Sequence, residues 1–190
     1  MTLSIVRCDG PDADGPPDAP PLSADLVVLS FSDAALARYA RVWHGTGQQL
    51  PALYLANISR PLPPQALRDT AAAARGVLVH LPEGLDDWRD GIETLVALAR
   101  DQRIALAVIA DQPDPRLDAL SNLPRTTLRR LASLCRGSDD QAARAVLTQL
   151  SLAAGLTIEP WLDQAASPID CAAQGDGHPA AAEPIRGMLR

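Results

Sequence analysis

Short apolar segments alternate with amphipathic segments along the middle of the chain. Four segments of six or seven residues are almost continuously apolar, which is typical of strands that are buried on both faces of a parallel sheet. They are Leu26–Phe31, Ala52–Ile58, Gly76–Leu81 and Ile104–Ala110. A shorter apolar segment, Leu3–Arg7, is a candidate for a further strand.

Helical periodicity fills the intervals between these strands. Ala34–Trp43 has an apolar face at helical spacing, with Asp33 as a candidate N-cap and Gly45 as the stop. The next helix is expected to begin at Pro64, because proline suits the first turn, and to end near Arg75. The residues expected on the apolar face of the first helix are Leu36, Tyr39, Ala40 and Trp43.

Three further helices are expected. Asp86 or Asp87 is positioned to cap a long helix that follows the third strand. Thr126–Cys135 and Asp139–Ala154 are the last two, and Ser138 with Gln141 matches a capping box for the final helix. The long helix has one apolar side, formed by Leu85, Trp88, Ile92, Leu95 and Ala99.

Strands that alternate with helices predict right-handed βαβ units. The expected fold class is therefore α/β, a doubly wound and mainly parallel sheet of four to five strands, flavodoxin-like or Rossmann-like. Residues 1–24 are expected to form a short strand and a Pro/Asp-rich loop, residues 25–157 the α/β domain, and residues 158–190 a flexible tail or linker.

Composition excludes several functions. All 17 basic residues are arginine, so a P-loop lysine, a Schiff-base lysine and a lysine general base are absent from this chain. The net charge of −6 argues against nonspecific nucleic-acid binding. Three widely spaced cysteines, Cys8, Cys135 and Cys171, predict neither a disulfide framework nor a metal site. With no signal-peptide pattern and no apolar run long enough to span a membrane, we expect a cytoplasmic protein.

Candidate ligand-binding residues lie where the predicted strands end, because ligands of open α/β sheets bind beyond the carboxyl ends of the strands. The expected polar rim comprises Ser32, Asp33, Asn57, His80, Glu83, Asp111 and Asp114, and Trp88 and Arg89 follow in the next helix.

Each candidate also has a simpler structural explanation. Asp33 is favoured as an N-cap over an anion site, and Trp88 as core packing over a surface for a flat ligand. Arg89 could meet a ligand carboxylate or pair with Asp86 or Glu93 on its own helix. Spatial convergence of His80, Glu83 and Asp111 is the arrangement that would favour an independent enzyme. No catalytic residue is assigned.

Several segments resemble, in order, the N-terminal region of the large subunit of aerobic cobaltochelatase (CobN), a family related to the large subunit of magnesium chelatase. The resemblance runs from about Asp25 to Leu152. The segments that carry it are Asp25–Asp33, Leu53–Asn57, Ala74–His80, Gly84–Glu93, Ile104–Ile109, Pro113–Ser121 and Asp140–Leu150.

The resemblance implies a domain of a multi-subunit ligase that inserts cobalt into hydrogenobyrinic acid a,c-diamide during cobalamin biosynthesis. Cobalt and ATP would belong to the parent complex, and this chain alone is expected to bind no cofactor or metal and to be inactive. The implied partners are the remainder of the large subunit, the ATPase subunits and a tetrapyrrole, with no nucleic acid or membrane. Asn57, Trp88, Arg89 and Asp114 match family-like positions near the rim.

The chain departs from the family pattern at strand-end turns. Pro82-Glu83-Gly84 stands where the family usually carries Gly-Gly, and Asp87 and Asp90 replace an aromatic pair. These changes motivate an alternative, a self-standing small-ligand-binding or protein-interaction module on a flavodoxin-like scaffold.

Overall fold

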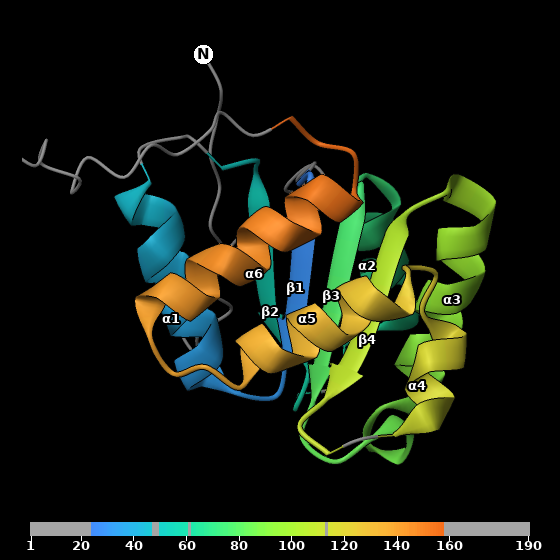
Figure 1. Ribbon diagram of the computed structural model, residues 1–190. Coiled ribbons are helices and arrows are strands. Elements are labelled where there is room, and N and C mark those ends of the chain that lie inside the picture. The colour runs from blue at the N-terminus through green and yellow to red at the C-terminus, as the bar shows by residue number, and fades with distance from the viewer. Residues whose placement is uncertain (1–23, 47–49, 61, 113, 158–190) are drawn as a thin grey trace, which may run out of the picture. The chain divides into compact units, whose positions relative to one another are not determined.

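The computed structural model describes residues 24–46, 50–60, 62–112 and 114–157. These residues belong to one compact unit, shown in Figure 1. The strand expected at residues 3–7, the loop expected before residue 24 and the tail expected from residue 158 lie outside the described residues.

Four parallel strands form the sheet, as the apolar segments predict. They are β1 (Leu26–Ser30), β2 (Leu53–Asn57), β3 (Gly76–Leu81) and β4 (Ala105–Ala110), in the order β2-β1-β3-β4. The chain moves outward from β1 to β2 and then crosses back to β3, so the direction of winding reverses between β1 and β3. This is the doubly wound, flavodoxin-like order with its fifth strand missing from the described sheet.

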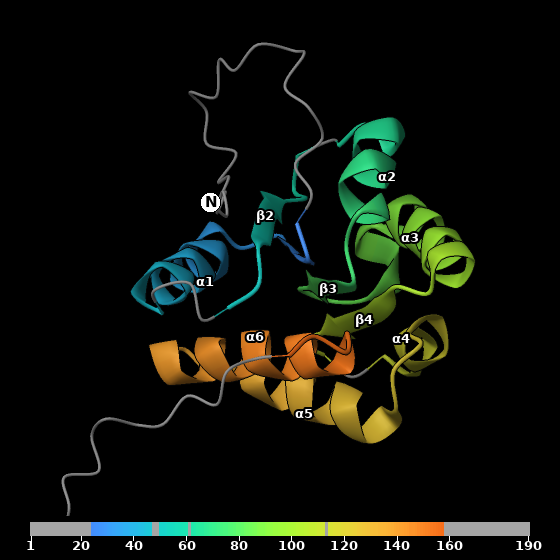
Figure 2. The same ribbon diagram turned by 90° about the horizontal axis from the view of Figure 1, so that it is seen from above.

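Helices cover both faces of the sheet (Figures 1 and 2). On one face lie α1 (Asp33–Gly45), α5 (Arg125–Cys135) and α6 (Asp140–Ala153). On the other lie α2 (Pro64–Ala72) and α3 (Arg89–Gln102), while α4 (Pro115–Leu120) packs beside β4. Residues Leu85–Asp87 form a single 3₁₀ turn before α3.

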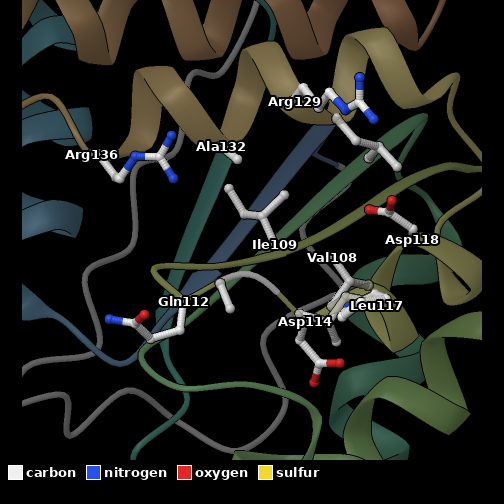
Figure 3. A pocket seen from close by; sticks show the side chains of 12 residues that line it. Val108, Ile109, Gln112, Asp114, Leu117, Asp118, Arg129, Ala132 and Arg136 are labelled. Carbon is white, nitrogen blue, oxygen red and sulfur yellow. The ribbon is translucent and has the colours of Figure 1, made fainter.

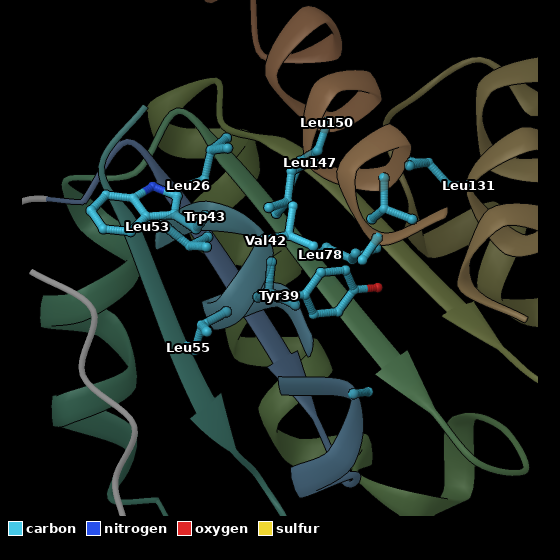
Figure 4. Close-up of a cluster of buried hydrophobic side chains, with 14 of the residues drawn as sticks. Leu26, Tyr39, Val42, Trp43, Leu53, Leu55, Leu78, Leu131, Leu147 and Leu150 are labelled. Carbon is cyan, nitrogen blue, oxygen red and sulfur yellow. The ribbon is translucent and has the colours of Figure 1, made fainter. Parts of the chain in front are cut away.

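Strand residues alternate between two hydrophobic clusters. In β1, Leu26 and Val28 join the cluster under α1, α5 and α6, whereas Val27 and Leu29 join the one under α2 and α3. All five β1 residues are buried, which explains why the segment is apolar without alternation. Figure 4 shows the first cluster, to which α1 contributes Tyr39 and Trp43 and α6 contributes Leu147 and Leu150.

Three expected helix starts are wrong by one or two residues. Ser32, not Asp33, caps α1, because the Ser32 hydroxyl accepts a hydrogen bond from Ala35 N–H at 3.2 Å. Asp139, not Ser138, caps α6. Trp88 precedes α3 without a side-chain cap, because the two aspartates expected to cap it lie in the 3₁₀ turn.

The short helix α4 was not expected, because two prolines frame its start. Asp114 is its N-cap, and the carboxylate accepts a hydrogen bond from Arg116 N–H at 3.0 Å. Pro115 occupies the first turn, where a missing N–H costs nothing.

Two side chains close the outer edge of β4. The Asn122 side chain accepts from Leu106 N–H at 2.7 Å and donates to the Ile104 carbonyl at 2.7 Å. The Ser121 hydroxyl accepts from Val108 N–H at 2.9 Å. These are hydrogen-bonding positions that a fifth strand would use, so the segment satisfies the edge and hinders pairing with another chain.

Replacing Asn122 tests this edge closure. Asn122→Ala should lower the free energy of unfolding by about 1–2 kcal/mol, because the Leu106 N–H and the Ile104 carbonyl lose their partners. Asn122→Asp keeps an acceptor but cannot donate, and should fall between wild type and Asn122→Ala. Urea denaturation provides the measurement. A change below about 0.5 kcal/mol for Asn122→Ala would show that the edge does not depend on this side chain.

Candidate functional site

The carboxyl ends of all four strands meet at one edge of the sheet. The strand register places Ser30 beside both Asn57 and His80, and Leu81 beside Ala110. The candidate residues predicted from the sequence therefore do lie along one rim, which the structure divides into three groups.

The first group joins the ends of β1 and β2. The Asn57 amide nitrogen donates to the Asp33 carboxylate at 2.5 Å, and its oxygen accepts from Ser59 N–H at 2.8 Å. Ser32 N–H donates to the Ser30 hydroxyl at 3.2 Å. Asp33 adds a negative charge to the first turn of α1, where the helix dipole favours it. These side chains order the β1 and β2 turns.

The second group is a single pair at the ends of β3 and β4. His80 Nε2 lies 2.9 Å from Asp111 Oδ1, with 12% of the histidine side chain and 51% of the aspartate side chain exposed. A carboxylate at this distance orients the imidazole ring. Of the three side chains whose convergence would favour an enzyme, His80 and Asp111 therefore lie in contact. No described hydrogen bond or ion pair connects the Glu83 carboxylate to either of them.

The third group links the loops that follow β3 and β4, and we refer to Asp86, Asp114, Arg89 and Arg116 as the Asp–Arg network. Arg116 donates to Asp114 at 2.8 Å and to Asp86 at 3.2 Å. Arg89 donates to Asp86 at 2.6 Å. Asp114 also accepts from Leu85 N–H at 3.3 Å. The network thus ties the start of α4 to the turn that precedes α3.

Arginine contacts keep the carboxylates of this network ionised. The hydrogen bonds from Arg116, together with backbone N–H groups, lower the pKa of Asp114 to about 2. The hydrogen bonds of Arg89 and Arg116 also lower the pKa of Asp86. The hydrogen bonds that Arg116 donates to Asp114 and Asp86 raise its own pKa. A carboxylate with a pKa this low cannot act as a general acid near neutral pH. We therefore interpret the network as a structural link between the loops that follow β3 and β4.

Trp88 lies partly buried against the second hydrophobic cluster, as its core-packing interpretation expects. The indole covers Gly91 so closely that a Cβ atom there would overlap Cε2, Cζ2 and Cδ2 of the ring. Glycine in the first turn of α3 therefore allows the ring to pack down onto the helix.

Alanine substitution at two glycines tests this contact. Gly91→Ala should destabilise the protein by about 1–3 kcal/mol, because the indole must move, although alanine ordinarily favours a helix. Gly45→Ala is the matched control: no atom lies within 4 Å of a Cβ there, so a gain of up to about 1 kcal/mol is expected. Thermal and urea unfolding measure both. Equal effects of the two substitutions would contradict the close packing.

Two further side chains with reactive groups, Tyr39 and Cys135, contact each other. The Tyr39 hydroxyl lies 3.5 Å from the Cys135 thiol, and burial raises the pKa of both, that of Cys135 to about 11. The thiol is therefore protonated and a poor nucleophile near neutral pH. Within the described ranges, no group of three or more His, Cys, Asp or Glu side chains could hold a metal ion. None of the helices seen there is long and apolar enough to cross a membrane.

A cavity of about 320 Å³ lies beside β4, between its carboxyl end, α4 and α5 (Figure 3). Its position differs from the switch point between β1 and β3, where the doubly wound fold usually binds ligands. The residues that sequence reasoning missed are Arg116 in the network and Gln112, Arg129 and Arg136 in the cavity wall. Arg136 caps the end of α5, and its spacing of seven residues from Arg129 places both on one helical face, a signal that could have paired them.

The architecture and rim define the chain as a doubly wound, flavodoxin-like α/β domain. No protein-family model matches the chain. It is similar to the aerobic cobaltochelatase subunit CobN of Pseudomonas aeruginosa, with 36% identity over 118 residues, covering 56% of this chain and 9% of that protein.

A solved structure, the catalytic subunit of cobaltochelatase from Mycobacterium tuberculosis, has the same fold. The TM-score is 0.54 at 23% identity, covering 66% of this chain and 10% of that subunit. The resemblance to the CobN family drawn from the sequence is therefore confirmed. The chain spans only about a tenth of the length of either protein.

Proposed function

We propose that this chain is a domain of a cobaltochelatase-type large subunit and that its rim docks onto the rest of the chelatase. The observation that carries the proposal is the 36% identity over 118 residues to a CobN subunit. In this role the chain does not chelate by itself. The assembled complex would use ATP to insert cobalt, its metal substrate, into a tetrapyrrole such as hydrogenobyrinic acid a,c-diamide.

The chemistry of the rim favours docking over enclosure of the tetrapyrrole. Four of the nine candidate side chains already hydrogen-bond to one another, in the Asn57–Asp33 and His80–Asp111 pairs, and Arg89 and Asp114 are bonded within the Asp–Arg network. Such pairs form a fixed polar surface that a partner can meet with little loss of conformational freedom. The cavity beside β4 is lined by Asp114 but by neither of these two pairs.

Glu83 and Arg89 are the charged rim residues proposed to contact the partner. Glu83 is exposed, and Arg89 is half exposed in its ion pair with Asp86. Charges at the rim of an interface guide association and select partners. The partners proposed are the remainder of the large subunit and the ATPase subunits.

Reconstitution tests the proposal. The tagged chain is mixed with the remaining large-subunit region and the ATPase subunits of its source organism, and complexes are separated by size. A stable complex is expected. The charge-swapped variant Glu83→Arg/Arg89→Glu should bind about tenfold more weakly.

The matched control swaps the same residue types at exposed positions further along α3 than Arg89. Glu93→Arg/Arg100→Glu keeps the net charge, and both positions are exposed. It should bind like wild type. Absence of any complex with the unmodified chain would refute the proposal and favour the self-standing module. Equal losses for the two swaps would refute docking through the rim.

A further inference from the structure

The cavity lies beside Ala110, just beyond the β4 residues whose outward-facing backbone groups are hydrogen-bonded by side chains. Ser121 and Asn122 satisfy the outward-facing backbone of Leu106 and Val108. Asp111 N–H donates to the Leu81 carbonyl, so its neighbour Ala110 turns its own N–H and carbonyl away from β3. Ala110 lines the cavity. A ligand there would therefore find backbone hydrogen-bonding groups as well as side chains.

The wall formed by α5 and the residue that caps its end carries two arginines, Arg129 and Arg136, with Ala132 between them. Arg129, Ala132 and Arg136 follow each other at helical spacing and all line the cavity (Figure 3). Seven residues of helix correspond to about 10 Å along the axis. None of the described residues forms an ion pair with Arg129 or Arg136, whereas Arg41, Arg89 and Arg116 are paired.

The remainder of the cavity is mainly apolar, and its polar side chains are Gln112, Asp114 and Asp118. Leu117 and Leu128 contribute to its lining, and their side chains are almost fully buried. Asp114, also in the lining, is neutralised by Arg116. Asp118 on α4 has no ion-pair partner among the described residues. Two unpaired guanidinium groups against one unpaired carboxylate make the cavity locally positive on a chain of net charge −6.

We propose that this cavity binds a small organic dianion of the aliphatic dicarboxylate class. Arg129 and Arg136 hold the two carboxylates, and the apolar middle packs against Leu128 and Ala132. A volume of about 320 Å³ is at the lower end of the range for small-molecule sites, so it suits a short-chain ligand and not a tetrapyrrole. The cavity shares Asp114 with the Asp–Arg network of the rim, whereas Arg129 and Arg136 lie outside that network.

Titration with suberate tests the site. Backbone amide NMR shifts should change saturably at Ala110, Gln112 and along α5. Octanoate has one carboxylate fewer and 1,8-octanediol has none, so octanoate should bind about fivefold more weakly than suberate and the diol more weakly still. Absence of saturable shifts at these residues, or equal affinity for all three compounds, would overturn the proposal.

Variants of the wall separate binding from changes in stability. Arg129→Gln and Arg136→Gln should each weaken suberate binding about fivefold, whereas Arg130→Gln, on the same helix but outside the cavity lining, should not. Asp118→Asn should strengthen binding about threefold, because it removes the opposing charge. A damaged fold could not produce that gain. No effect of either arginine substitution, or weaker binding by Asp118→Asn, would contradict the assignment.

Discussion

Closure of the sheet at β4 determines much of the remaining structure. The backbone of an edge strand must find hydrogen-bond partners, and here two side chains from one connecting segment provide them. The chain therefore adds no fifth strand in the described sheet and continues as α5 and α6. Both helices return to the face already covered by α1, where they complete the first hydrophobic cluster. The cavity lies just beyond the last closed position, at Ala110.

The rim lies where doubly wound sheets usually bind ligands, but several of its side chains hydrogen-bond to one another. In a doubly wound sheet the carboxyl ends of the strands commonly provide an open polar crevice. In this chain, hydrogen bonds join neighbouring strand ends to each other, and the Asp–Arg network fixes the loops after β3 and β4. A rim of this kind is suited to presenting a defined surface, which agrees with a domain that works as part of a larger assembly.

The strands could be predicted because burial on both faces requires a continuous apolar segment, which is visible in the sequence. Helix starts were less predictable. Ser32 and Asp33 are both good caps, and the choice depends on backbone geometry that the sequence does not reveal. Asp87 was expected near a helix cap, but its carboxylate accepts hydrogen bonds from Glu83 and Gly84 N–H, which stabilises the 3₁₀ turn.

Long-range contacts were the least predictable. The partners of Asn122 lie 16 and 18 residues away, and those of Arg116 include Asp86, 30 residues away. His80 and Asp111 could be proposed as neighbours because both follow strands of one sheet. Glu83 is just as close in sequence, but no described hydrogen bond or ion pair joins its carboxylate to either residue. Its role in docking rests on exposure and charge alone.

The most direct test of the account is the size of the particle that contains this sequence in its native cells. Cell extracts are separated under native conditions and probed with an antibody to the domain. The account predicts a signal at a mass far above the 20.1 kDa of the chain, in the same fractions as the chelatase subunits. A signal confined to a free protein of about that mass would contradict the proposal that the chain works as part of a chelatase.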